Sequence, residues 1–206
     1  MKLTQALEYA TKIAALLTEK SKQFGQMSIA TINGQSLMGT LSIMMAADSK
    51  KVEALHPWFQ EIILFGSAAE GKENPSDVDL IAFDQGFYSN VILAPLKRAR
   101  YGYIQRNLRD LLTGWFGFQD GDPEVKATFD NDVDLLVLPL AVLTDPVERQ
   151  EFADQQSDPE FLQNAFSNML CFDPDSGQFV KIDLSYFEQK YSVDLSELRK
   201  TADVTA

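Results

Sequence analysis

The spacing of apolar residues predicts one amphipathic helix and three buried strands. Between residues 3 and 24, apolar side chains recur mostly three and four positions apart, which places them on one face of a helix. Three later runs are almost continuously apolar, as expected of strands that are buried on both faces. These runs cover residues 61–65, 78–83 and 133–138.

Further segments extend this pattern into an α/β fold. We expect helices over residues 95–112 and 160–170 and a strand over residues 178–187. Residues 27–47 contain an Asn-Gly turn signal and form either a hairpin or broken helices. The predicted fold is a short, mixed, twisted sheet flanked by helices.

Length and composition limit the chain to one main core. With 206 residues, of which 45% are hydrophobic, it is long enough for one well-buried core but short for two full domains. We expect an N-terminal helical or irregular extension over residues 1–50 and a core over 51–145. Residues 146–206 would form a C-terminal extension that packs on this core.

Charge and cysteine content narrow the choice of partner and compartment. The 30 acidic and 18 basic side chains give a net charge of -12, so a nucleic acid is a less favoured partner. The single cysteine, Cys171, is expected to be buried; it excludes an intrachain disulfide and suits a reducing compartment. No segment approaches the roughly 20 apolar residues of a membrane span. We therefore expect a cytoplasmic protein without membrane contact.

One internal echo carries the strongest chemical signal. Ser-Asp-Val-Asp-Leu at residues 76–80 and Asn-Asp-Val-Asp-Leu at 131–135 each stand at the start of an expected strand. Successive side chains of a strand alternate between its faces, so the two aspartates of each pair project to the same side. If the strands are neighbours, three or four carboxylates converge, and Mg²⁺ ions would relieve their repulsion. The carboxylates are Asp77, Asp79, Asp132 and Asp134.

The segment before the first pair offers a place for phosphate groups. The strand at residues 61–65 ends at Gly66-Ser67. A glycine allows the backbone to turn and lets phosphate oxygens come close, while exposed N–H groups and the Ser67 hydroxyl can donate hydrogen bonds. A phosphate cradle and a metal site are thus separated by one short loop.

Together these motifs resemble a known family. The run Leu-Phe-Gly-Ser-Ala-Ala-Glu-Gly at residues 64–71, followed by Ser-Asp-Val-Asp-Leu at 76–80, is similar to the signature of the DNA polymerase beta-like nucleotidyltransferases. The closest resemblance is to the small, stand-alone "minimal" members. It covers roughly residues 61–139 and implies a nucleotidyltransferase core.

The resemblance also implies roles for individual residues. Gly66 and Ser67 would hold the triphosphate, and Asp77 and Asp79 would bind two Mg²⁺ ions. A third aspartate would complete the metal site and help to deprotonate the attacking hydroxyl. Asp134 is preferred over Asp132 for this role, because it directly precedes the apolar run. Asp183 is a weaker alternative.

Two positions depart from the family pattern. Ala68 and Glu70 stand where minimal members commonly carry basic or aromatic residues. Because Glu70 would repel a triphosphate, the phosphates would need a further cation. Lys72 is our first candidate, with Arg98 and Arg100 as alternatives.

The implied activity is transfer of a nucleoside monophosphate, by default AMP from ATP, to a hydroxyl group. The acceptor would be a protein, as in antitoxin-type members that adenylylate a partner toxin, or a small molecule, as in antibiotic-modifying members. A homo-oligomer or a toxin partner is compatible with this interpretation. The alternative is a catalytically degenerate binding or regulatory module that keeps the fold without turnover.

Overall fold

A five-stranded mixed sheet forms the centre of the protein. The computed structural model describes residues 1–26, 59–84, 123 and 133–199. Its strands are β1 (Phe59–Phe65), β2 (Val78–Asp84), β3 (Val133–Pro139), β4 (Leu170–Asp173) and β5 (Gln178–Lys181). They lie in the order β3-β2-β1-β4-β5. Only the β2–β3 pair is parallel, and the other neighbours are antiparallel. The prediction of a mixed α/β sheet is confirmed.

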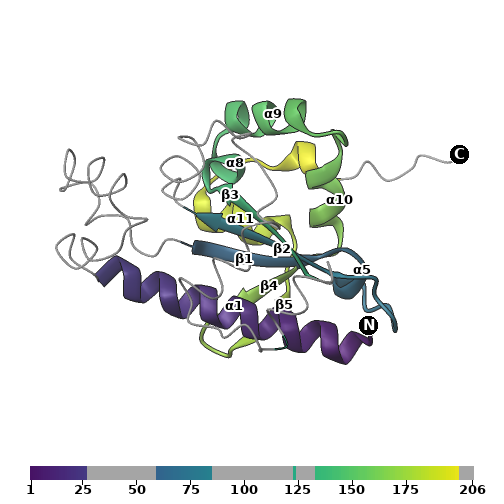
Figure 1. Ribbon diagram of the computed structural model, residues 1–206. Helices are drawn as coiled ribbons and strands as arrows, with labels where there is room; N and C mark the ends of the chain where they lie inside the picture. Colours follow the sequence, from purple (N-terminus) through teal and green to yellow (C-terminus); the bar gives the residue numbers. More distant parts are fainter. Residues whose placement is uncertain (27–58, 85–122, 124–132, 200–206) are drawn as a thin grey trace, which may run out of the picture.

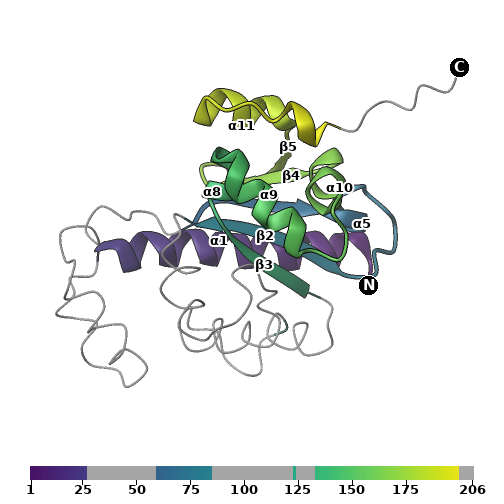
Figure 2. The same cartoon turned by 90° about the horizontal axis from the view of Figure 1, so that it is seen from above.

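Helices cover both faces of this sheet. They are α1 (Leu3–Gln26), α5 (Gly66–Ala69), α8 (Ala141–Thr144), α9 (Pro146–Gln155), α10 (Phe161–Ser167) and α11 (Leu184–Tyr191), with a short 3-10 helix η5 (Ser196–Leu198). Figure 1 shows α1 below the sheet and α8 to α11 above it, and Figure 2 shows the same elements from above. Among these helices, none is both long enough and apolar enough to cross a membrane.

The α1 face of the sheet is closed by the predicted helix stripe. The stripe residues are Ala6, Ala10, Ile13, Ala14 and Leu17, all fully buried. They pack against alternate residues of β1, β2 and β3, including Leu64, Leu80 and Leu135. Three of the five stripe residues are alanines, whose small side chains let the helix approach the sheet closely. Burial of this stripe therefore holds α1 across the three strands that carry the aspartates.

The opposite face is covered by the elements that follow β3. Ile63, Ile81 and Leu136 project from the central strands into a second core with Phe152 of α9 and Phe187 of α11. The strands β1 to β3 are thus buried on both sides, which explains why their sequences are continuously apolar rather than alternating.

Two sequence-based boundaries in the C-terminal part are wrong. The helix expected over residues 160–170 ends at Ser167, and the chain enters β4 at Leu170. The strand expected over 178–187 stops at Lys181, and α11 follows from Leu184. Asp183 caps this helix by accepting a hydrogen bond from the Ser185 N–H at 2.9 Å. The apolar run extends across a helix start, and periodicity alone does not separate the two elements.

Other expectations lie outside the described residues. These are the hairpin or broken helices at 27–47 and the basic helix at 95–112. The division at residues 50 and 145 stays a prediction, although α1 packs on the sheet and β4 and β5 extend it.

A buried arginine joins the C-terminal segment to the second core. Arg149 of α9 is 5% exposed. Its guanidinium donates to the backbone oxygens of Val142 (3.2 Å), Leu143 (2.8 Å) and Asp194 (3.4 Å) and to Glu197 Oε1 (2.8 Å). The fork geometry of one side chain thus satisfies carbonyl groups from two segments.

We predict that Arg149→Met lowers the free energy of unfolding by about 2–4 kcal/mol, because buried carbonyl oxygens lose their donor. The matched control is Arg199→Met, whose side chain is 50% exposed and pairs with Glu188. This control should cost less than about 1 kcal/mol. Urea denaturation measures both values, and equal costs for the two variants would contradict the assigned role of Arg149.

Candidate metal centre

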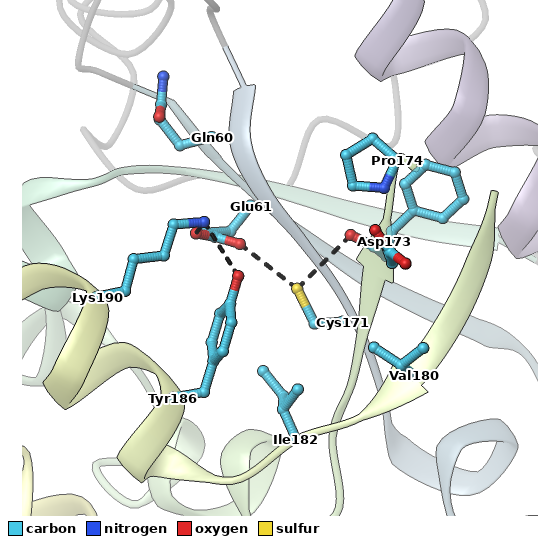
Figure 3. A pocket seen from close by; sticks show the side chains of 10 residues that line it. Gln60, Glu61, Cys171, Asp173, Pro174, Val180, Ile182, Tyr186 and Lys190 are labelled. Carbon is cyan, nitrogen blue, oxygen red and sulfur yellow. Dashed lines mark hydrogen bonds and ion pairs between the residues drawn. The ribbon is translucent and has the colours of Figure 1, made fainter. Parts of the chain in front are cut away.

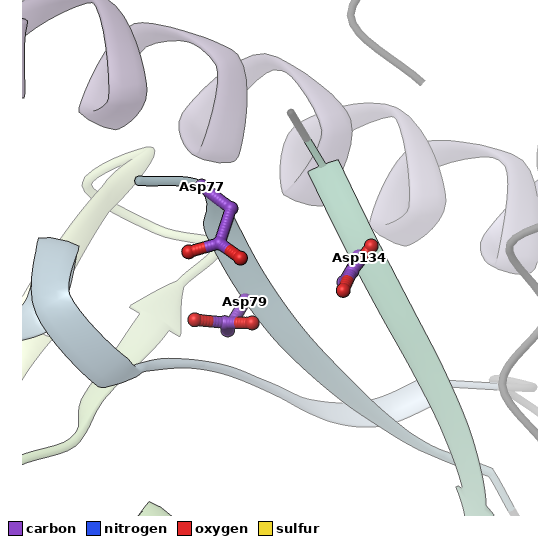
Figure 4. Close-up of side chains that lie close together, drawn as sticks. All are labelled: Asp77, Asp79 and Asp134. Carbon is purple, nitrogen blue, oxygen red and sulfur yellow. The ribbon is translucent and has the colours of Figure 1, made fainter. Parts of the chain in front are cut away.

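The three aspartates that the sequence predicts as metal ligands lie close together at one end of the sheet. Carboxylate oxygens of Asp77, Asp79 and Asp134 all lie within 4.8 Å of one another. Figure 4 shows Asp77 and Asp79 at the beginning of β2 and Asp134 beside them on β3. Asp132, the alternative third carboxylate, lies outside the described residues.

Strand register explains the convergence. In the parallel β2–β3 pair, Asp79 stands opposite Asp134, and Val78 stands opposite Val133. The valines face the α1 core, so the aspartates project to the other face. A shift of one residue in either strand would separate the carboxylates and expose the valines, so burial of the apolar positions fixes the geometry of the carboxylate cluster.

The glycine turn lies directly beside this cluster. On the other side of β2, Phe65 of β1 is opposite Asp79, and the chain turns at Gly66 into α5. Gly66 has φ of +68°, a left-handed conformation that favours glycine. The first turn of α5 leaves backbone N–H groups without intrahelical partners. The turn and the carboxylates therefore form one continuous site.

Ser67 provides a polar atom in need of a partner. Its Oγ is buried, and among the described residues it has no hydrogen-bond partner. A buried hydroxyl of this kind normally costs free energy unless a ligand or water satisfies it. This is the observation expected if Ser67 binds an oxygen of a ligand.

The two positions that depart from the family pattern behave differently. Ala68 is 2% exposed and packs in the α1 core, so its side chain does not face the carboxylate cluster. Glu70 forms an exposed ion pair with Lys72, with 2.9 Å between Nζ and Oε2. Such a pair is weak and screened by solvent, so Lys72 remains able to exchange partners. Arg98 and Arg100 lie outside the described residues.

Burial and repulsion between the carboxylates both act on Asp79. Burial, followed by the charges of Asp77 and Asp134, raises the pKa of Asp79 from 3.8 to about 7. Burial and the charge of Asp77 also raise the pKa of Asp134. Ser76 donates a hydrogen bond of 2.5 Å to Asp77 Oδ1. A divalent cation would remove this repulsion, and three carboxylates are the oxygen donors that Mg²⁺ prefers.

A second group of titratable side chains surrounds Glu61 at the beginning of β1, beside a cavity of about 210 Å³ (Figure 3). Glu61 is 4% exposed and accepts from Lys190 (2.6 Å), the Tyr191 hydroxyl (2.5 Å) and the Cys171 thiol (3.4 Å). Burial and the Glu61 charge raise the pKa of Cys171, which keeps the thiol protonated. These side chains satisfy one another's hydrogen bonds, and the contacts of Lys190 and Tyr191 with Glu61 anchor α11 to β1. Its only sequence signal is a glutamate in an apolar strand.

Asp183, the weaker alternative ligand, is the cap of α11 and is not among the three clustered carboxylates. The geometry thus brings together Gly66, Asp77, Asp79 and Asp134.

The pKa of Asp79 predicts a pH-dependent stability of the metal-free protein. Below pH 3.8 the carboxyl is protonated in both states, and between 3.8 and about 7 only the folded state keeps the proton. Stability therefore falls as pH rises through this window and is constant above it. Allowing for solvent screening, we expect a loss of about 1–2 kcal/mol between pH 5 and 8.

Asp79→Asn should reduce this slope and make the metal-free protein more stable at pH 8, while the raised pKa of Asp134 leaves a smaller slope of the same sign. Urea unfolding in EDTA at several pH values measures the effect. Asp183→Asn is the control: the pKa of Asp183 is lowered by hydrogen bonds from Ser185, so its contribution does not change in this range. A slope in Asp79→Asn as steep as that of the unmodified protein would contradict the assignment.

No family model, curated protein or solved structure matches the chain. The comparisons therefore assign neither the fold nor the candidate metal centre to a known family. Evidence on function therefore comes from the carboxylate cluster, the adjoining turn and the resemblance of their motif.

Proposed function

We propose that the protein is a Mg²⁺-dependent nucleotidyltransferase that transfers a nucleoside monophosphate to a hydroxyl group. The observation that carries the proposal is the cluster of Asp77, Asp79 and Asp134, with oxygens within 4.8 Å of one another, directly beside the Gly66 turn. Partly buried carboxylates that repel one another destabilise the fold unless a ligand relieves the repulsion, and a cation next to a phosphate cradle would do so.

The three aspartates would hold two Mg²⁺ ions. When bound, these ions would supply charge neutralisation for the attacking and leaving oxygens of a phosphoryl displacement. The role of the chain is to fix the ligands: the paired strands β2 and β3 present Asp79 and Asp134 side by side. Asp134 would also accept the proton of an acceptor hydroxyl, as the family resemblance implies.

The triphosphate would lie against Gly66 and Ser67. The orphaned Ser67 Oγ supports this placement, because a phosphate oxygen would give the buried hydroxyl its missing partner. Lys72 is the nearest cation in sequence and would contact phosphates by leaving its exposed pair with Glu70. ATP is the proposed donor on family resemblance alone.

The acceptor is proposed as a class, a protein or small-molecule hydroxyl. A nucleic acid is less favoured by the net charge of -12. The degenerate-module alternative is motivated in part by Ala68, which stands where the family commonly carries a basic or aromatic residue. Burial of Ala68 in the α1 core weakens this argument, since a longer side chain there would meet the core rather than the carboxylate cluster.

Calorimetric titration with a non-hydrolysable ATP analogue, with and without Mg²⁺, tests the proposal. We expect binding that requires Mg²⁺ and that is lost in the Asp77→Asn/Asp79→Asn variant, because two of the three carboxylate ligands lose their charge. The fold should persist, since relief of repulsion stabilises it.

The matched control is Asp175→Asn/Asp183→Asn, which removes the same charge from two exposed positions outside the cluster. It should bind like the unmodified protein. Absence of nucleotide binding by the unmodified protein would favour the degenerate module, and retention of Mg²⁺-dependent binding by Asp77→Asn/Asp79→Asn would contradict the metal centre.

A further inference from the structure

Gly66 differs from the other described glycines in what surrounds it. Gly66, Gly71 and Gly177 all have positive φ, at 68°, 76° and 67°. A Cβ atom on Gly71 or Gly177 would meet nothing within 4 Å, whereas one on Gly66 would lie 2.4 Å from Asp79 Oδ2. The backbone conformation is therefore shared, and contact with a carboxylate is particular to Gly66.

The contact follows from strand register. Phe65 is paired with Asp79 across the β1–β2 ladder, and the chain turns immediately after it. The turn brings the Cα of Gly66 over the Asp79 carboxylate, the side chain that also adjoins Asp77 and Asp134. One residue of the loop thus forms a wall of the carboxylate cluster.

An alanine at this position would act on the carboxylate more than on the fold. The backbone on either side is held by the β1–β2 ladder and by the hydrogen bond from Glu70 N to Gly66 O at 3.1 Å. Asp79 Oδ2, in contrast, is the free end of a side chain, and it can rotate away from a new methyl group. Rotation would carry the Asp79 carboxylate out of its place beside the other two carboxylates.

We propose that Gly66 is a positioning residue of the metal centre: it lacks a side chain because Asp79 Oδ2 occupies that space while the Asp79 carboxylate lies beside Asp77 and Asp134. The inference rests on the proposed function and deepens it. It gives the glycine a role that precedes any nucleotide, since the wall is formed in the protein alone. The expected consequence is a loss of metal affinity that does not depend on triphosphate contacts.

Binding of Mn²⁺ to the nucleotide-free protein provides the test, with the free ion followed by electron paramagnetic resonance at pH 8. Mn²⁺ takes the same oxygen ligands as Mg²⁺. We expect Gly66→Ala to weaken Mn²⁺ binding about 10- to 100-fold, the range found when a group that orients a metal ligand is lost.

The control is Gly177→Ala, which introduces the same methyl group at nearly the same φ without the contact. It should bind Mn²⁺ like the unmodified protein. In EDTA, thermal unfolding should show a similar decrease in midpoint for both variants, because both carry the same backbone strain. If Gly66→Ala loses Mn²⁺ binding while Gly177→Ala keeps it, and the two variants are equally stable, a general structural defect does not explain the loss.

A crystal structure of the metal-free Gly66→Ala variant completes the experiment. We expect the Asp79 carboxylate to be turned away from Asp77 and Asp134. Unchanged Mn²⁺ affinity in Gly66→Ala, or an Asp79 carboxylate that keeps its position in the crystal, would overturn the proposal. Absence of Mn²⁺ binding by the unmodified protein would instead contradict the proposed metal centre, and the crystal structure would still decide the steric role of Gly66.

Discussion

Parallel pairing of β2 with β3 is the constraint on which the site depends. It places Asp79 opposite Asp134 and, with Asp77 on the same face, holds three carboxylates within 4.8 Å of one another. Their partial burial and mutual repulsion oppose this arrangement, and both raise the pKa of Asp79. The strands remain in register because their alternate residues are buried in two cores, one under α1 and one under the helices that follow β3. Apolar packing thus sustains an electrostatically unfavourable cluster.

The distribution of satisfied and unsatisfied polar groups separates structural from functional chemistry. Arg149 fills its donors with backbone oxygens and Glu197, and Glu61 receives hydrogen bonds from Lys190, Tyr191 and Cys171. Arg149 joins the C-terminal segment to α8 and α9, and Glu61 joins α11 to the sheet. Where β1 passes into α5, by contrast, a buried Ser67 hydroxyl has no partner among the described residues, and the neighbouring Gly66 lies against the carboxylate of Asp79. Conflicts of this kind, concentrated in one place, are typical of a site that a ligand completes.

Gly66 connects the two halves of the proposed function. Its positive φ turns the chain from β1 into α5, and its missing side chain leaves room for Asp79. The same residue would therefore shape the proposed phosphate cradle, and it borders the three carboxylates. Coupling between the two would follow from contact alone, since a shift of the turn would move the wall against which Asp79 rests. The proposed nucleotidyltransferase would then bind metal and triphosphate as one unit.

The sequence by itself determined the local features: the α1 stripe, the three apolar strands, and the pair Asp77 and Asp79 on one face at the start of β2. These follow from periodicity, a property of neighbouring residues. It misjudged the region of residues 167–184, where an apolar run extends from β5 toward α11 and a capping aspartate marks the change. Only the tertiary structure decided that β2 and β3 are neighbours, that Ala68 is a core residue, that Glu61 anchors α11 and that Gly66 faces Asp79. The physical reason is that these contacts either join residues far apart in the chain or depend on strand register. Register is selected by burial of the whole core, and no local pattern encodes it.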